Sequence, residues 1–155
     1  MALFRVSNTK RSEDILDYCK NQVLNNEYTP LTGYDNRINV TNGGYIVDPN
    51  NSKKIIIYVE ATWEYINLFG QLNNFSSVMI LNGIPKVASS SDSGQISPVN
   101  VPNSVVLYNA RNDTFVPITF ASSLTGISII MYCPNASDRF NLGDKLYIYG
   151  YYYKA

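Results

Sequence analysis

The segment Asp144-Lys-Leu-Tyr-Ile-Tyr-Gly-Tyr-Tyr-Tyr-Lys154 predicts the fold class, because its side chains alternate between two kinds. Successive side chains of a β-strand point to opposite faces of the sheet. One face carries aliphatic and small residues with one tyrosine: Leu146, Ile148, Gly150 and Tyr152. The other face carries only tyrosines: Tyr147, Tyr149, Tyr151 and Tyr153. The first face is typical of a dry core. Tyrosine has an apolar ring and a polar hydroxyl, so the second face indicates a half-wet surface or one covered by a partner.

The same two-residue period recurs upstream of this strand. Residues 53–62 place aliphatic and small side chains on one face: Ile55, Ile57, Val59 and Ala61. Residues 114–121 do the same with Val116, Ile118 and Phe120. We expect turns at Asn42-Gly43-Gly44, at 48–52 and at 110–113, and a tight hairpin at Asn82-Gly83 between strands 77–81 and 84–88. About eight short strands with frequent turn signals predict a mainly β fold, an antiparallel β-sandwich of the jelly-roll type.

One segment near the start of the chain has a helical period instead. Between residues 10 and 25, apolar side chains recur at the spacing of one helix face: Ile15, Leu16, Cys19, Val23 and Leu24. This stripe is too short for a coiled coil, so it must pack on the same domain, on a sister subunit or on another protein. We therefore expect an N-terminal arm and amphipathic helix over 1–30 and a β-sandwich domain over 31–155.

Composition limits the possible partners of the chain. Only 15% of its residues are charged, against about 25% in typical domains, and the formal net charge is +0. Nucleic acid is therefore not expected as a partner, because phosphate binding needs a basic excess. Neither a secretion signal nor an apolar run long enough to span a membrane is evident, which predicts a soluble protein made in a cytoplasm without a membrane partner.

The residues that usually carry chemistry are sparse. The chain has no histidine, and Cys19 and Cys133 lack the spacing of a zinc site, so we expect two reduced buried thiols and no metal or other cofactor. Glu60 and Glu64 are the only pair that suggests a glycosidase. Glu60, however, lies in the outward register of its strand, where a solvated carboxylate is ordinary. We therefore expect no enzymatic activity.

Two segments of the C-terminal third resemble virion proteins of tailed phages. Val105-Val-Leu-Tyr-Asn-Ala-Arg-Asn-Asp-Thr-Phe-Val-Pro-Ile-Thr119 is similar to their strand–turn–strand segment of the form "YN…FVP". Leu142-Gly-Asp-Lys-Leu-Tyr-Ile-Tyr-Gly150 is similar to their closing strand of the form "GDxxYIxG". In that class the segments belong to head-fibre, capsid-decoration and baseplate or fibre-adaptor domains, which are generally trimeric β-sandwiches. The resemblance implies no catalytic residue.

The first hypothesis is a non-enzymatic structural protein of a phage virion, assembled in the host cytoplasm as a homotrimer attached to capsid or tail. Its candidate attachment residues lie in the arm and helix: Leu3, Phe4, Val6, Ile15, Leu16, Cys19 and Val23. The second hypothesis is a carbohydrate-binding module. The candidate subunit or glycan surface is aromatic: Trp63, Tyr147, Tyr149, Tyr151 and Tyr153. We prefer the interpretation that Trp63 closes one end of the core and that the tyrosines cover a sister subunit, because aromatic residues are enriched at protein interfaces.

Overall fold

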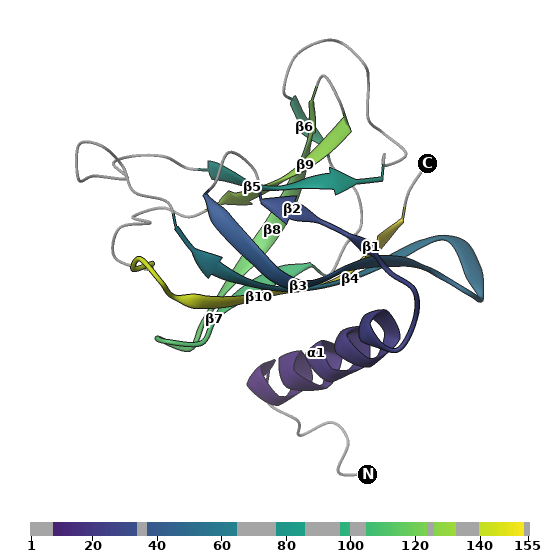
Figure 1. Cartoon of the computed structure of the whole chain (residues 1–155), viewed down its shortest axis with the longest axis horizontal. Coiled ribbons are helices and arrows are strands. Elements are labelled where there is room, and N and C mark those ends of the chain that lie inside the picture. Colours follow the sequence, from purple (N-terminus) through teal and green to yellow (C-terminus); the bar gives the residue numbers. More distant parts are fainter. Residues whose placement is uncertain are drawn as a thin grey trace.

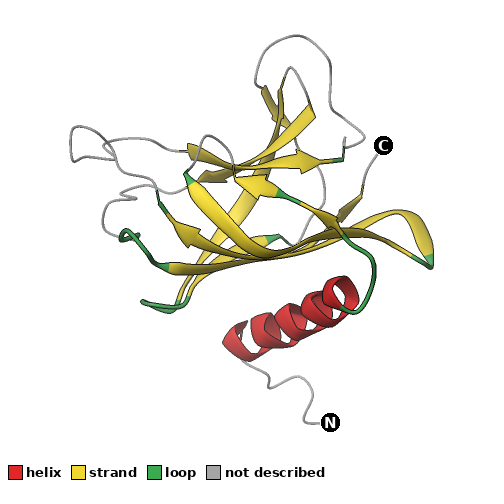
Figure 2. Ribbon diagram, viewed as in Figure 1, coloured by secondary structure: helices red, strands yellow, loops and turns green. Residues whose placement is uncertain are grey.

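A computed structural model describes residues 8–33, 37–64, 77–85, 97–99, 105–123, 126–132 and 140–153 of the chain. These residues form one helix, α1 (Asn8–Leu24), which strands follow. In chain order the strands are β1 (Thr29–Pro30), β2 (Thr32–Gly33), β3 (Ile38–Asp48), β4 (Asn51–Trp63), β5 (Ser77–Ile84), β6 (Ser97–Val99), β7 (Val106–Asn109), β8 (Thr114–Ser123), β9 (Gly126–Tyr132) and β10 (Lys145–Tyr153). Figures 1 and 2 show three layers, with α1 against a first sheet and a second sheet on the other side.

The strands pair in the order β1-β3-β4-β10-β7-β8-β9-β5-β2, with β6 beside β8, and every pairing is antiparallel. The first sheet contains β1, β3, β4, β10, β7 and the start of β8, and the second contains the rest of β8 with β6, β9, β5 and β2. Two segments pass from one sheet to the other. In β8, residues 114–117 pair with β7 and residues 118–123 pair with β9. At the opposite corner, β1 pairs with β3, and β2 pairs with β5. Strands that change sheets make the corners of a sandwich, so the fold is the sandwich-like one that the sequence predicts.

The space between the two sheets is filled by the side chains predicted to point inward. Leu146, Ile148 and Tyr152 of β10 are at most 2% exposed and belong to one cluster. The inward faces of β4 and β8 belong to the same cluster: Ile55, Ile57, Val59, Ala61, Val116, Ile118 and Phe120. Full burial of one such aliphatic side chain contributes roughly 1.5–3 kcal/mol. This interior is therefore what holds the two sheets together.

Helix α1 covers the outer face of the first sheet. Cys19 and Val23 have no exposed surface and belong to a second cluster with Ile56, Tyr58 and Tyr149. The apolar stripe of the helix therefore packs on the same domain, which was one of the three predicted alternatives. The expected domain boundary at residue 30 falls within β1, whose residues pair with β3.

The turn predicted at Asn42-Gly43-Gly44 is wrong, because β3 continues through these residues. The register against β4 shifts between Val40 and Asn42, which is a β-bulge. Gly43 has a φ of +88°, and a Cβ at Gly44 would clash with the carbonyl oxygen of Thr29 in β1. The glycines thus serve a bulge and a close approach of strands rather than a reversal of the chain.

The hairpin predicted at Asn82-Gly83 is also wrong. Both residues lie inside β5, and the register against β9 shifts between Leu81 and Ile84. Gly83 has a φ of +90°, so the local signal for a tight turn again marks a bulge. The turns predicted at 48–52 and at 110–113 are confirmed as the β3–β4 and β7–β8 connections.

Candidate functional site

Three aromatic side chains form a row across the outer face of the first sheet, beside α1. Tyr147 on β10 lies opposite Tyr108 on β7, and Tyr108 lies opposite Phe115 on β8. The ring centroids are 6.1 Å apart for Tyr147 and Tyr108, and 4.7 Å apart for Tyr108 and Phe115. All three residues are half-buried. We refer to Phe115, Tyr108 and Tyr147 as the aromatic row.

The rings of the aromatic row contact one another across the strands, with Tyr108 stacked on Phe115 and tilted toward Tyr147. The ring planes differ by 30° in each pair, and the closer centroid distance matches the separation of neighbouring strands, about 4.7–4.9 Å. The Tyr108 ring is therefore flanked by Phe115 and Tyr147.

Charged and polar groups surround the aromatic row. The Tyr108 hydroxyl donates a hydrogen bond of 2.8 Å to Asp113 Oδ1. Lys145 Nζ lies 5.5 Å from the centroid of the Tyr147 ring. Glu60 is the partner of Tyr147 on the neighbouring strand β4. An aromatic centre with a polar rim of both charges is the anatomy of many protein interfaces.

A chain of hydrogen bonds lies next to this rim. The Tyr28 hydroxyl donates to Asn42 Oδ1 at 3.2 Å, and Asn42 Nδ2 donates to Glu60 Oε2 at 3.3 Å. Tyr58 lies on the same face of β4 as Glu60, with its ring centroid 6.5 Å from that of Tyr147. Burial raises the pKa of Tyr58, and the neighbouring Glu60 carboxylate raises it further, so the phenol stays protonated.

A small cavity of about 100 Å³ extends the aromatic row beneath α1. It is lined by Leu16, Tyr108, Asp113, Phe115 and Tyr149. The helix and the aromatic row therefore share a packing surface.

The predicted aromatic surface residues are not all at the surface. Trp63 is 1% exposed and stacks on Phe140 in the core, with centroids 4.6 Å apart, so it closes the interior. Tyr149 is 1% exposed and lies under α1. Tyr147 and Tyr151 are half-buried and Tyr153 is 39% exposed.

The predicted attachment residues of the helix face inward. Cys19 and Val23 are fully buried, and Ile15 and Leu16 pack on the same cluster against the first sheet. Leu3, Phe4 and Val6 lie outside the described residues. The Cys19 thiol is free and lies 3.6 Å from the Gly150 carbonyl oxygen, to which it donates. Burial raises the pKa of this thiol to about 11.

Sequence reasoning missed Tyr108 and Phe115. Their signal was present, since each occupies the outward register of its strand, next to the inward residues Leu107 and Val116. What the sequence did not contain was the order of strands that brings these two rings beside Tyr147.

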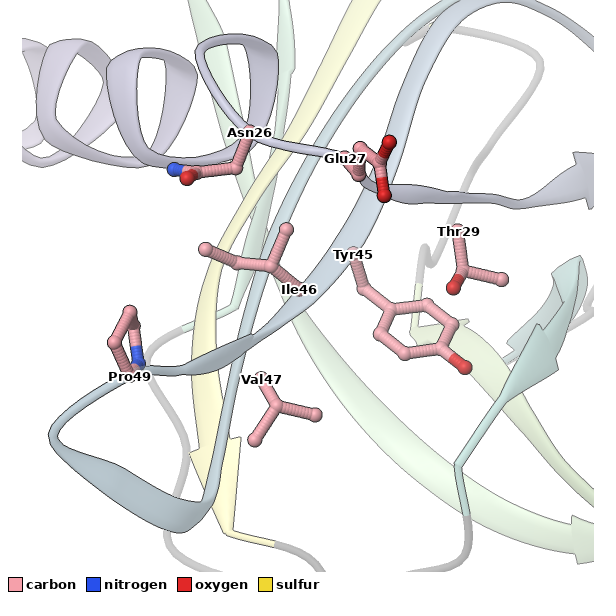
Figure 3. A pocket seen from close by; sticks show the side chains of 7 residues that line it. All are labelled: Asn26, Glu27, Thr29, Tyr45, Ile46, Val47 and Pro49. Carbon is pink, nitrogen blue, oxygen red and sulfur yellow. The ribbon is translucent and has the colours of Figure 1, made fainter.

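A second feature is an open cleft of about 390 Å³ at the edge of the first sheet. One wall consists of residues after α1, namely Asn26, Glu27 and Thr29, and the other of residues from β3 and its turn, namely Tyr45, Ile46, Val47 and Pro49. Figure 3 shows Asn26 and Glu27 across the space from β3, with Pro49 at the hairpin end. We refer to this space as the edge cleft.

The two segments that carry the resemblance meet at a buried carboxylate. Asp144, which precedes β10, accepts hydrogen bonds from Asn109 Nδ2 at 2.9 Å, Arg111 Nε at 2.8 Å and the Asn141 amide at 2.7 Å. Burial acts to raise the pKa of Asp144, but these donors outweigh it and lower the pKa. This arrangement fixes the β7–β8 turn against the start of β10.

The described residues offer little for catalysis or metal binding. Glu64 is exposed just after β4 and accepts a hydrogen bond from Thr62, while Glu60 is bound by Asn42. In the described ranges, no three His, Cys, Asp or Glu side chains gather in a way that would hold a metal ion. The described part of the chain also contains no helix with the length and apolarity needed to cross a membrane.

Comparison of the chain with protein-family models, with curated proteins and with solved structures found no match.

Proposed function

We propose that this protein is a non-enzymatic structural component of a phage virion, which works by protein–protein assembly as a homotrimer attached to the capsid or tail. The observation that carries the proposal is the position of the aromatic row. Its three members come from β7, β8 and β10, the strands formed by the two segments that resemble virion proteins. The resemblance and the best candidate interface therefore coincide in one part of the fold.

The chemistry of the row supports assembly. Half-buried aromatic side chains contribute a large apolar area at low entropic cost, and they are enriched where proteins meet. The surrounding charges, Asp113, Lys145 and Glu60, give such a contact its orientation rather than most of its affinity. Apolar burial supplies about 25 cal/mol per Å² before the entropy of association is subtracted.

The experiment is a measurement of molar mass by light scattering over a range of protein concentrations. We expect a mass near three times the 17.4 kDa of one chain. Replacing Tyr147 by Ser should shift the equilibrium toward the monomer, because this ring lies in the row. Tyr153→Ser is the matched control, since Tyr153 lies on the same face of the same strand but outside the row.

A wild-type mass of 17.4 kDa at every concentration would contradict self-assembly. The same two variants should then be compared for co-sedimentation with phage particles. Equal behaviour of wild type, Tyr147→Ser and Tyr153→Ser in both assays would remove the aromatic row from the proposal.

A carbohydrate-binding module is the second candidate. The hydrogen-bonded chain of Tyr28, Asn42 and Glu60 beside Tyr147 favours it, because amide and carboxylate groups next to an aromatic ring can bind sugar hydroxyls. A glycan array would test it. A signal lost in Asn42→Ala and kept in the control Asn39→Ala would support this candidate, and absence of any signal would count against it.

A further inference from the structure

Strand β3 has an open edge at one end. It runs from Ile38 to Asp48, but β1 pairs only with Gly44 and Tyr45. Residues 46–48 therefore have β4 on one side and, among the described strands, none on the other. An unpaired stretch of strand edge is a template for another extended chain.

The edge cleft lies along this open stretch. Ile46 and Val47 form part of its wall, and the residues that follow α1 form the opposite wall. Every residue that lines the cleft belongs to the described part of the chain. The open stretch of three residues is about 10 Å long, and Val47 exposes 41% of its surface there. The unpaired edge of β3 therefore borders the open cleft.

We infer that the edge cleft binds residues 3–6 of a second copy of this chain, which add a β-strand to the open edge of β3. This inference rests on the proposed function and deepens it, because it names a sister chain as the partner and β3 as the place of docking. The aromatic row remains a separate surface.

The sequence of this segment matches the walls of the cleft. In an extended Leu3-Phe4-Arg5-Val6, Phe4 and Val6 share one face and Arg5 lies on the other. Glu27 is the charged residue among those that line the cleft, and it is exposed. Arg5 is therefore complementary in charge to the cleft, while Phe4 and Val6 would lie on the opposite face of the added strand. Asp48, at the end of β3, is already paired with Lys54 at 3.7 Å.

Residues 3–6 are too close to the start of α1 to reach the edge cleft of their own chain. Helix α1 begins at Asn8, and the cleft lies past its other end, beside Asn26. A helix of 17 residues is about 25 Å long. Leu3 lies five positions before Asn8, and a fully extended chain of five steps spans at most about 18 Å. The segment therefore reaches the edge cleft of a neighbouring copy but not its own.

Charge reversal in the full-length protein tests the pairing of Arg5 with Glu27. Light scattering over a concentration range would compare wild type, Arg5→Glu, Glu27→Arg and the double variant. We expect each single variant to associate about fivefold more weakly and the double variant to return close to wild type, because it restores opposite charges. Glu64→Arg is the control for net charge, since Glu64 is exposed and outside the cleft.

A second variant tests the strand edge without changing the arm. Val47→Lys places a charge on the open edge, a common protection against strand addition, and should weaken association at least as much as Glu27→Arg. If Val47→Lys weakens association and Arg5→Glu does not, a different segment occupies the cleft and the inference is overturned.

The remaining outcomes separate the inference from the proposed function. If Tyr147→Ser abolishes association but neither Glu27→Arg nor Val47→Lys affects it, assembly stands and the arm inference fails. Single variants that weaken association with no recovery in the double variant also overturn the inference. A wild type that never associates overturns the arm inference along with self-assembly.

Discussion

The side-chain amide of Asn109 donates a hydrogen bond of 2.9 Å to Asp144 Oδ2, and both residues are buried. This contact joins β7 to the residue before β10 across 35 positions of sequence. Arg111 adds an ion pair of 2.8 Å to the other carboxylate oxygen. The parts of the chain that resemble virion proteins are thus linked through the Asp144 carboxylate. The aromatic row lies on β7, β8 and β10, the strands that this carboxylate holds together.

Asp144→Asn should lower the free energy of unfolding at pH 7 by about 2 kcal/mol, because it weakens hydrogen bonds to a charged, buried acceptor. The pKa of Asp144 is lowered in the folded protein. Its stabilising contribution is therefore present above the unfolded pKa of about 3.9 and is lost as the pH falls through the folded value. Urea unfolding at pH 7 and at pH 3 would measure this, and the variant should lose less stability on acidification than wild type.

Asp113→Asn is the control for that experiment, since Asp113 is exposed and Asn tolerates its positive φ of 55°. A loss of stability in Asp113→Asn equal to that in Asp144→Asn would contradict a special role for the buried carboxylate.

Val23→Ala should destabilise the protein by about 2 kcal/mol, because Val23 is fully buried between α1 and the first sheet. Val47→Ala makes the same chemical change at a side chain that is 41% exposed, and should cost less than about 0.5 kcal/mol in the monomer. Thermal or urea unfolding would compare them. Equal costs would mean that α1 is not docked on its own sheet.

Gly44→Ala should destabilise the fold by about 1–3 kcal/mol, since the added Cβ would clash with the Thr29 carbonyl oxygen and push β1 away from β3. Amide hydrogen exchange at Thr29, the residue of β1 that has a backbone N–H, should then become faster, while exchange in β10 should stay as in wild type. In Gly143→Ala the new Cβ meets no atom within 4 Å, so exchange in β1 should stay as in wild type although the positive φ is strained.

Cys19 should react slowly with iodoacetamide in the folded protein at pH 8, because the thiol is buried and its pKa is raised to about 11. The fold favours the neutral thiol. The contribution of Cys19 to the free energy of unfolding is therefore present below the unfolded pKa of about 8.5 and is lost as the pH rises toward the folded pKa. Peptide mass spectrometry would follow Cys19 alone. Alkylation as fast in the native protein as in urea would show that the thiol is accessible.

The sequence alone was sufficient to predict most of the strands and which of their side chains point into the core. The inward residues of β10, β4 and β8 are in the core as predicted, because a period of two directly assigns side chains to the faces of a sheet. The helix and its apolar stripe were also predictable, since Cys19 and Val23 recur at helical spacing. These features depend on neighbours within a few residues.

Tertiary structure decided what covers each face. Local signals at Asn42-Gly43-Gly44 and Asn82-Gly83 suggested turns, but strands packed alongside keep both segments extended as bulges. Trp63 lies in the core and Tyr149 lies under α1. The sequence could not place Tyr149 there, because a strand pattern does not reveal which face of the sheet a helix will cover. The aromatic row and the Asn109–Asp144 contact arise from strand order, because the packing of distant segments is selected by the burial of the whole chain rather than by any short stretch of it.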